Sequence, residues 1–409
     1  MIAEAAQERL APKTVAQLCE ILARCDRERR NVRVEGGKTL SGFGPVLAQA
    51  DFIVSTTNLH AIITHEYHDL TCSVQSGVRV AQLAAALAKH GQFVPIDVPL
   101  SKKATVGGSL ASGWPGPRRH LYGRARDFVI GSQVVLADGT LAHAGGMVVK
   151  NVSGYDMSKL YIGSFGTLGV FAQLNFKTLP IPRRRRALIA PLPEATRSRA
   201  IMQIAALPVI PAAAFCAEGF GKTVDGTDDI DGRVLLYFEG SEELLDRATL
   251  EARSALGRAG VPETAIVDTG ASESFDRSLN ACIANKRGRS ITYRSLGLPG
   301  TAQERAVLLR DVCNRHELFT DVLFDVMNGD VFVRASERSA ERFAAKIALC
   351  HAELRALEPR AVIVASDAPI RATFEAWGAT PPAIEKMRAL KARFDPHGTL
   401  NPGRFIGGI

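Results

Sequence analysis

The chain has 409 residues, of which 46% are hydrophobic and 22% are charged. This length allows two or three domains with sizeable cores, and this composition excludes disorder along the whole chain. The formal net charge of +8 favours an anionic ligand or an acidic partner. Nucleic-acid binding is not expected, because the basic residues are scattered and have no aromatic residues interleaved with them.

The N-terminus and the cysteines bear on the cellular compartment. Glu4 and Glu8 lie where a secretion signal needs an apolar core, and no apolar run approaches the length of a membrane span. The seven cysteines are dispersed and include no Cys-x-x-Cys, which argues against a disulfide framework and an iron–sulfur cluster. We therefore expect a cytoplasmic chain without direct membrane insertion, whose cysteines mostly fill the core.

The first hundred residues alternate between predicted helices and short strands. Thr14 and Gln17 form a capping box for a helix whose apolar face runs from Val15 to Leu22 and includes Cys19. The further predicted elements are strands at 32–34, 52–55 and 71–75 and a helix over 80–87 that Gly91 stops.

No metal site is expected. The stretch His65-Glu66-Tyr67-His68 has one residue between Glu66 and the second histidine, where the zinc-protease pattern needs two. We therefore predict a solvated loop there. Elsewhere no pair of histidines lies near a carboxylate at ligand spacing.

Three glycine-rich segments lie before residue 182. The first, Glu35 to Thr39, follows a strand, so its backbone N–H groups can surround a pyrophosphate while Lys38 offsets the charge; an exposed glycine turn is the alternative. The second, 104–113, has small residues that let a ligand approach the backbone; a tightly packed helix start is the alternative. The third, Gly145 to Phe171, has glycines in apolar company and suits a flat ligand lying against the backbone.

Strands flank the third segment, and a boundary follows it. A strand is predicted over 128–136, with a hairpin turn at 137–140, and an alternating strand over 170–176. Pro180-Ile181-Pro182 indicates a domain boundary. The run Arg183 to Arg186 after it is expected to be a solvated junction, with a partner contact or a phosphate salt bridge as alternatives.

The second half repeats a helix–strand–strand–helix order, which suits an antiparallel sheet with helices on one face. It is poor in catalytic candidates, because Cys350 and His351 fall along or beside a buried helical face. A carboxylate substrate could be bound by Arg287, Arg289, Tyr293, Arg294 and Arg334. Surface arginines are common, however, and nothing in the sequence singles these residues out. The predicted elements are helices at 192–207, 241–257, 301–316, 339–357 and 382–393 and strands at 213–218, 233–238, 318–325 and 330–335.

Taken as an ordered set, several motifs resemble the FAD-binding flavoproteins of the vanillyl-alcohol oxidase (PCMH-type) family, and among them most closely the FAD-binding E-type subunits of bacterial glycolate oxidases. The resemblance is close over residues 1–182 and at the C-terminus. It rests on 34–39 (VEGGKT), 105–109 (TVGGS), 116–119 (GPRR), 123–127 (GRARD), 150–156 (KNVSGYD), 163–170 (GSFGTLGV) and 401–405 (NPGRF).

The resemblance implies an α+β fold with a two-subdomain FAD-binding domain and an α+β cap domain built on an antiparallel sheet. The implied boundaries are 1–182 for the FAD-binding domain (subdomains 1–100 and 101–182), 183–380 for the cap, and 381–409 for a segment that returns to the first domain. Lys38 stands where relatives with covalent FAD carry histidine, so non-covalent FAD is implied.

Carried over by motif, the site residues fall into groups around the FAD. One loop would hold the pyrophosphate, a second would line it from the other side, and a third would meet the flavin or adenine end with backbone atoms. Lys150 and Tyr155 are weak catalytic candidates. The implied FAD-binding residues are Gly36, Gly37, Lys38, Thr39, Thr105, Gly107, Gly108, Ser109, Lys150, Asn151, Tyr155, Gly163, Gly166, Thr167, Gly169, Val170 and Asn401.

The resemblance also implies a function and partners. Phe165 stands where catalytic relatives carry glutamate, which implies a subunit that works beside a catalytic flavin subunit and an iron–sulfur subunit in oxidising glycolate, a 2-hydroxy acid. Any membrane association would then come through those partners. The alternatives are a self-sufficient FAD-dependent dehydrogenase or oxidase of an alcohol or 2-hydroxy acid, and an assembly subunit that has lost its flavin.

Overall fold

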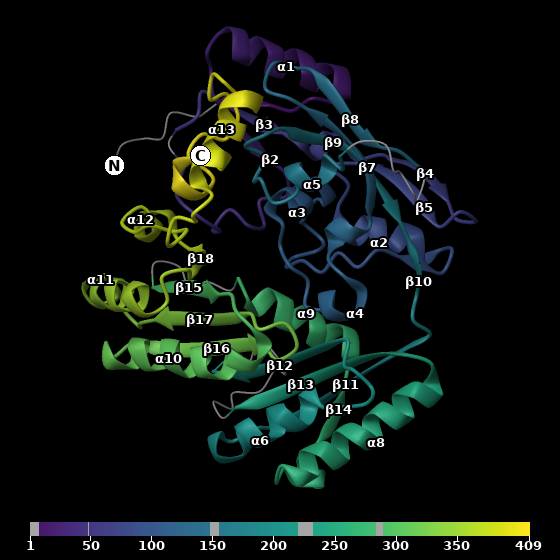
Figure 1. Ribbon diagram of the computed structural model, residues 1–409, viewed down its shortest axis with the longest axis vertical. Helices are drawn as coiled ribbons and strands as arrows, with labels where there is room; N and C mark the ends of the chain where they lie inside the picture. Colours follow the sequence, from purple (N-terminus) through teal and green to yellow (C-terminus); the bar gives the residue numbers. More distant parts are fainter. Residues whose placement is uncertain (1–7, 48, 148–154, 220–231, 284–288) are drawn as a thin grey trace. The chain divides into compact units, whose positions relative to one another are not determined.

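The structure is a computed structural model that describes residues 8–47, 49–147, 155–219, 232–283 and 289–409. The chain forms two compact units (Figure 1). Unit 1 comprises Met1–Gly116, Arg124–Ile181 and Thr380–Ile409, and unit 2 comprises Pro117–Gly123 and Pro182–Ala379. The predicted first domain is thus interrupted, because residues 117–123 cluster with unit 2.

Unit 1 begins with a small parallel sheet covered by a helix. Strands β1 (Glu8–Leu10) and β2 (Val32–Glu35) pair on either side of β3 (Phe52–Ser55). Helix α1 (Val15–Arg27) buries Leu18 and Leu22 against this sheet, as its periodicity predicts, while Cys19 is only partly buried. The Thr14 hydroxyl accepts from the N–H of Gln17 at 3.2 Å, whereas the Gln17 side chain accepts from Lys13 rather than closing the box on Thr14.

A second, antiparallel sheet completes unit 1, in the order β4-β5-β9-β7-β8. The prediction of a loop at 65–68 is wrong in its first half, because β4 extends through Glu66. Three residues before His65, namely Ile62 to Thr64, are β-branched and favour a strand. The strands are β4 (Ile62–Glu66), β5 (Thr71–Gln75), β7 (Val129–Val135), β8 (Leu141–Gly145) and β9 (Val170–Lys177), and β6 (Gln92–Phe93) pairs separately with β10 (Leu179–Pro180).

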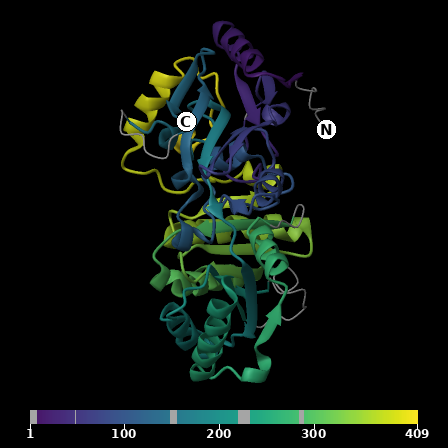
Figure 2. The same ribbon diagram turned by 90° about the vertical axis from the view of Figure 1, so that its right-hand side faces the viewer.

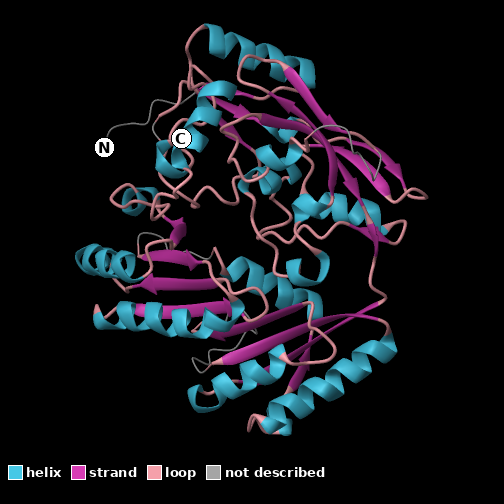
Figure 3. Cartoon of the chain, in the orientation of Figure 1, coloured by secondary structure: helices cyan, strands magenta, loops and turns pink. Residues whose placement is uncertain are grey.

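Short helices connect these strands, as Figure 3 shows. Helix α2 buries Val80, Leu83 and Leu87. The chain turns shortly after this helix at Gly91, whose φ of +67° is a left-handed conformation that favours glycine. A shared core joins α1, both sheets and Leu400 near the C-terminus. The helices of unit 1 are α1, α2 (Val80–Ala88), α3 (Val106–Ser112), α5 (Ser158–Tyr161) and α13 (Ile384–Phe394), with 3-10 turns at Thr56–Asn58, Ala125–Asp127 and Ile406–Gly408.

Unit 2 is an eight-stranded antiparallel sheet in the order β14-β11-β13-β12-β16-β17-β15-β18. Helices α6, α8, α10 and α11 bury one face of it in a single core, as predicted. Helix α9 packs on the other face, where Phe275 stacks on Tyr237. The strands are β11 (Arg184–Pro191), β12 (Ala213–Glu218), β13 (Arg233–Gly240), β14 (Val267–Thr269), β15 (Ser290–Ser295), β16 (Phe319–Asp325), β17 (Val331–Ser336) and β18 (Val362–Ser366).

Of the helices of unit 2, α6, α8, α10 and α11 follow the predicted order, whereas α4, α9 and α12 were not predicted (Figures 1 and 2). The helices of this unit are α4 (Arg119–Tyr122), α6 (Glu194–Ala205), α8 (Glu242–Arg258), α9 (Ala271–Ala281), α10 (Ala302–Arg315), α11 (Ala340–Leu357) and α12 (Ala368–Arg371), with 3-10 turns at Glu263–Ala265 and Pro299–Thr301. Within the described residues, no helix of either unit is both long and apolar enough to cross a bilayer.

Arg183 to Arg185 are exposed, as expected of a solvated segment, but from Arg184 onward the arginine run also belongs to this sheet. Strand β11 begins at Arg184, which pairs with Glu242 at 2.9 Å, and Arg186 pairs with Glu242 and Asp246, both at 2.9 Å. Arg185 bonds Glu239 at 3.1 Å. These partners lie on β13 and α8, so the arginines bind neighbouring elements of unit 2.

Candidate functional site

A cleft in unit 1 brings the three glycine-rich segments together with the C-terminal tail. Its walls come from the end of β2, the start of α3, the segment before β9, and the turn after α13. The lining residues are Val34, Gly36, Thr56, Ser76, Gly107, Gly108, Ala111, Phe165, Gly166, Gly169, Val170, Phe171 and Asn401.

The first loop needs its glycines because it lies directly against the chain before α3. A Cβ at Gly36 would come within 2.3 Å of the Thr105 Oγ1, and one at Gly37 within 1.9 Å of the Lys103 carbonyl oxygen. Lys38 has a φ of +58° and its Nζ lies 2.7 Å from Glu35. Gly36 lines the cleft, whereas Gly37, Lys38 and Thr39 of the predicted set do not.

Glu35 gathers three cations at the base of this loop. Besides Lys38, it pairs with Arg9 at 2.8 Å and Arg33 at 3.1 Å. One carboxylate thus faces three positive side chains, which leaves a local excess of positive charge beside the loop.

The second segment is a helix start, so its predicted alternative is right, and it also lines the cleft. The Thr105 hydroxyl caps α3 by accepting from the N–H of Gly108 at 3.3 Å. The Ser109 hydroxyl donates to the Thr105 carbonyl at 2.8 Å, so it is engaged within the helix. Gly107 and Gly108 line the cleft, and Thr105 and Ser109 support them from behind.

The third segment is held in left-handed backbone over the end of α3. Gly163 and Gly166 have φ of +83° and +72°, and Phe165 between them has φ of +55°. An aromatic residue in this region is strained and is kept there only by its surroundings. The Phe165 N–H donates to the Ala111 carbonyl at 2.8 Å. Thr167 is buried and bonds inward to Ser164 at 2.8 Å.

Asn401 closes the cleft from the C-terminal tail, as predicted for a segment that returns to the first domain. Its side-chain Oδ1 accepts from the N–H of Val34 at 2.8 Å, and its Nδ2 donates to the Phe165 carbonyl at 2.8 Å. Its own N–H donates to Val32 at 2.9 Å. One amide side chain therefore ties β2 to the third segment.

Lys391 is a positioning residue that sequence reasoning missed. From α13 its Nζ donates to the carbonyls of Thr167 and Leu400, both at 2.8 Å, and to Asp395 at 2.5 Å. Burial lowers the pKa of Lys391 from its ordinary value, although Asp395 opposes the shift. The spacing of Lys391 and Asp395, four residues apart at a helix end, was the available signal.

Aromatic rings surround Phe165. The Phe43 ring meets it edge-on with centroids 5.1 Å apart, and Phe405 lies 6.0 Å away. The Arg404 guanidinium lies 5.4 Å from the centre of the Phe165 ring and donates to the carbonyls of Leu40 and Pro45. The NPGRF motif thus ends against the Phe165 ring.

Ser76 is the second residue that sequence reasoning missed. It directly follows β5, it is 1% exposed, and it lines the cleft. Its hydroxyl has no hydrogen-bond partner within the described part of the chain. Nothing in the local sequence distinguishes it from other small residues near glycine.

Of the two weak catalytic candidates, Tyr155 does not line this cleft. Tyr155 is 95% exposed and is not a lining residue. Lys150 and Asn151 lie outside the described residues, so their placement stays a prediction.

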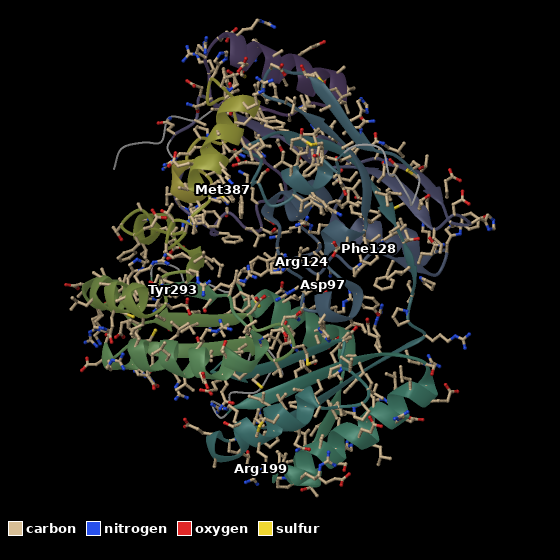
Figure 4. The ribbon with its side chains drawn as sticks, in the orientation of Figure 1. Asp97, Arg124, Phe128, Arg199, Tyr293 and Met387 are labelled. Carbon is tan, nitrogen blue, oxygen red and sulfur yellow. The ribbon has the colours of Figure 1, made fainter. Side chains whose placement is uncertain are left out.

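The carboxylate-binding candidates of unit 2 that the structure describes have partners within that unit. Arg294 bonds Asp330 at 3.1 Å, and Arg334 bonds Asp321 at 2.6 Å. The Tyr293 hydroxyl, labelled in Figure 4, lies 2.8 Å from the His351 Nδ1 in the core. Burial lowers the pKa of His351 to about 4. The remaining two are Arg289, which donates to the Arg338 carbonyl, and Arg287, which lies outside the described residues.

The arginines of the GPRR motif also belong to unit 2. Arg118 bonds the buried Glu239 at 2.9 Å, and Tyr122 donates to the same carboxylate at 2.7 Å. Burial alone would raise the pKa of Glu239, but Arg118 and the hydrogen bonds from Tyr122 and Tyr237 outweigh it and lower the pKa. Arg119 bonds Asp330 at 3.1 Å.

Comparison with known proteins agrees with this geometry. Residues 6–145 match the family described as FAD binding domain. Glycolate oxidase subunit GlcD of Bacillus subtilis (strain 168) is 25% identical to this chain, over 97% of this chain and 88% of the length of GlcD. Glycolate oxidase subunit GlcE of Escherichia coli (strain K12) is 38% identical over 36% of this chain, which spans under half (43%) of that relative.

A solved structure shows the same fold. The structure of p-cresol methylhydroxylase with substrate bound superposes with a TM-score of 0.72 over 97% of this chain and 88% of that one, at 15% identity. This likeness concerns the fold alone.

The cleft residues fit an FAD. Gly36, Gly107, Gly108 and Gly166 present backbone where side chains would narrow the cleft, and a Cβ at Gly166 would come within 2.8 Å of the Asn401 Nδ2. Ser76 supplies a buried hydroxyl with a free donor. Residues 6–145 are therefore an FAD binding domain, with FAD as its cofactor.

Proposed function

We propose that this chain is the FAD-binding subunit of a glycolate (2-hydroxy acid) dehydrogenase complex in the cytoplasm. It would work with a catalytic flavin subunit and an iron–sulfur subunit to oxidise glycolate to glyoxylate. The likeness to two glycolate oxidase subunits supports both the substrate class and the multi-subunit assembly.

One observation carries the division of labour between subunits. None of the cleft's lining residues in the described part of the chain is an Asp, Glu, His, Lys, Arg, Cys or Tyr. Removing a proton from a hydroxy acid needs a positioned base, and this cleft offers glycines, hydroxyls, apolar groups and the Asn401 amide instead. Phe165 occupies the place of the glutamate implied for catalytic relatives.

The side chains of this unit would bind the cofactor without leading the chemistry. Bound FAD supplies the capacity to accept two electrons from an alcohol carbon. Gly36, Gly107 and Gly108 would face its pyrophosphate, and Gly166 and Gly169 would face the ring system with backbone. Asn401 and Lys391 would hold the two walls of the cleft in place relative to each other. The Phe165 ring would exclude water from one end of the cleft.

The test is to purify the chain alone and with its partners. Alone it should be yellow, with about one FAD per chain removable by mild acid, and should reduce artificial acceptors slowly with glycolate. The rate should rise when the two partner subunits are added. Rapid flavin bleaching by glycolate in the isolated chain would instead favour the self-sufficient enzyme, and a colourless chain that takes up no FAD would favour the assembly subunit.

A further inference from the structure

Ser76 sits where three parts of unit 1 meet, and its main chain is fully bonded there. Its N–H donates to the carbonyl of Ala172 on β9 at 2.9 Å, and its carbonyl accepts from the N–H of Gly107 at 2.7 Å. A Cβ on Gly107 would come within 2.6 Å of the Ser76 Cβ. The position of the Ser76 side chain is therefore fixed by β9 and the start of α3.

The hydroxyl of Ser76 is the exception among the buried serines of unit 1. The others each have a partner: Ser73, for example, donates to Asn175 at 2.8 Å and accepts from Gln173 at 2.7 Å. The Ser76 Oγ is shielded from solvent and has no partner within the described residues. The other bonded buried serines are Ser55, Ser109, Ser132, Ser158 and Ser164.

An unpaired buried hydroxyl costs stability, and alanine would fill the same space without that cost. Packing therefore gives no reason for the oxygen atom. Ser76 lines the cleft beside Gly107 and Gly108, where a ligand acceptor would meet its hydroxyl.

We propose that the Ser76 hydroxyl is an FAD ligand that donates a hydrogen bond to an oxygen of the dinucleotide, and that its neighbours Gly107 and Gly108 make that oxygen one of the diphosphate. This inference rests on the FAD-binding role of the cleft. The FAD site would then include the Ser76 side chain besides the three glycine-rich segments. Its hydroxyl would form a hydrogen bond only when the cofactor binds.

The test uses the full chain, stripped of FAD and titrated with FAD again, with thermal unfolding of the stripped form measured in parallel. In Ser76→Ala the dissociation constant for FAD should rise about tenfold, since a hydrogen bond to a charged acceptor is lost. The stripped variant should melt about 2–4 °C higher than the wild type, because the unpaired hydroxyl is gone.

Ser73→Ala is the matched control, three residues earlier, on the strand β5 that Ser76 directly follows. It breaks the bonds to Gln173 and Asn175, so the stripped protein should melt lower, while the dissociation constant for FAD should stay within about twofold. A Ser76→Ala variant with unchanged FAD affinity, or one that melts lower as Ser73→Ala does, overturns the inference. If the wild-type chain itself takes up no FAD, the proposed function is contradicted, and this result is distinguishable because it appears before any variant is compared.

Discussion

The two units use their buried polar groups in opposite ways. In unit 2 the Glu239 carboxylate accepts hydrogen bonds from four side chains, Arg118, Tyr122, Arg185 and Tyr237, at 2.7–3.2 Å. In unit 1 the residues lining the cleft include glycines, Asn401 and Ser76, whose hydroxyl has no partner among the described residues. Unit 2 thus completes the hydrogen bonds of Glu239 with its own side chains, whereas the cleft of unit 1 presents backbone and a hydroxyl donor to a ligand.

This difference follows from what each kind of residue can do. A buried charge is tolerated only when other side chains complete its hydrogen bonds. A glycine costs conformational entropy and gives no contact of its own, so several of them in one cleft are retained only where something else must lie close. The comparison predicts that substitutions in unit 2 change stability, and that substitutions in the cleft change FAD binding.

The largest expected effect is in unit 2, at Glu239. Glu239→Ala would leave Arg118 and Arg185 without their carboxylate and two tyrosines without their acceptor, and should lower the free energy of unfolding of unit 2 by about 3–5 kcal/mol. Calorimetry would measure this. Arg184→Ala, which removes an exposed pair with Glu242, should cost under about 1 kcal/mol. Equal losses in the two variants would contradict the account.

The next largest effect is expected at Lys391 in unit 1, where one substitution should lower both the unfolding free energy and the affinity for FAD. Lys391→Met would leave Asp395 and the carbonyls of Thr167 and Leu400 without a donor, at a cost of about 1.5–3 kcal/mol in unfolding free energy. Affinity for FAD should fall as well, because the third segment loses its attachment to the tail. Chemical denaturation and FAD titration would test both.

Lys386 provides the control for that variant, since it is an exposed lysine on the same helix. Lys386→Met should change the unfolding free energy by no more than about 0.5 kcal/mol. If Lys391→Met bound FAD as the wild type does, Lys391 would be a purely structural residue.

A change confined to binding is expected at Gly108. A Cβ there would meet only the Thr105 Oγ1, at 3.0 Å, among the described atoms. Gly108→Val would therefore extend into the cleft and should weaken FAD binding by about 10- to 100-fold, from 1–3 kcal/mol of overpacking. Fluorescence titration with FAD would measure it. Unchanged FAD content in the purified variant would remove Gly108 from the site.

Much of the fold could be predicted from local pattern. Helices α10 and α11 and strands β16 and β17 lie within two residues of their predicted bounds, because amphipathic periodicity and the Asn328-Gly329 turn are local signals. Strand β11 could not be predicted, because the partners of its arginines lie more than 50 residues further along the chain. Four arginines in succession predict a solvent-exposed segment, which Arg183 to Arg185 are, but they do not predict a strand.

The site was predictable to the extent that it is made of backbone. Glycine-rich segments are visible in sequence, and Gly36, Gly107, Gly108, Gly166, Gly169, Val170 and Asn401 do line one cleft. Ser76 and Lys391 were not predictable. Whether a hydroxyl is left unpaired, or an ammonium reaches two carbonyls, depends on groups about 10 to 220 residues away that only the folded chain brings near.

The smallest expected effect compares one kind of substitution in the two units. Gly257 lies exposed in the last turn of α8, and a Cβ there meets nothing within 4 Å among the described residues. Gly257→Ala should raise the unfolding free energy of unit 2 by about 0.5 kcal/mol and leave FAD binding unchanged, because alanine loses less backbone entropy on folding. Gly108→Ala, the same change in the cleft, should instead weaken FAD binding. If both variants behaved alike in FAD titrations, the glycines of unit 1 would serve backbone conformation only, and the distinction between the two units would fail.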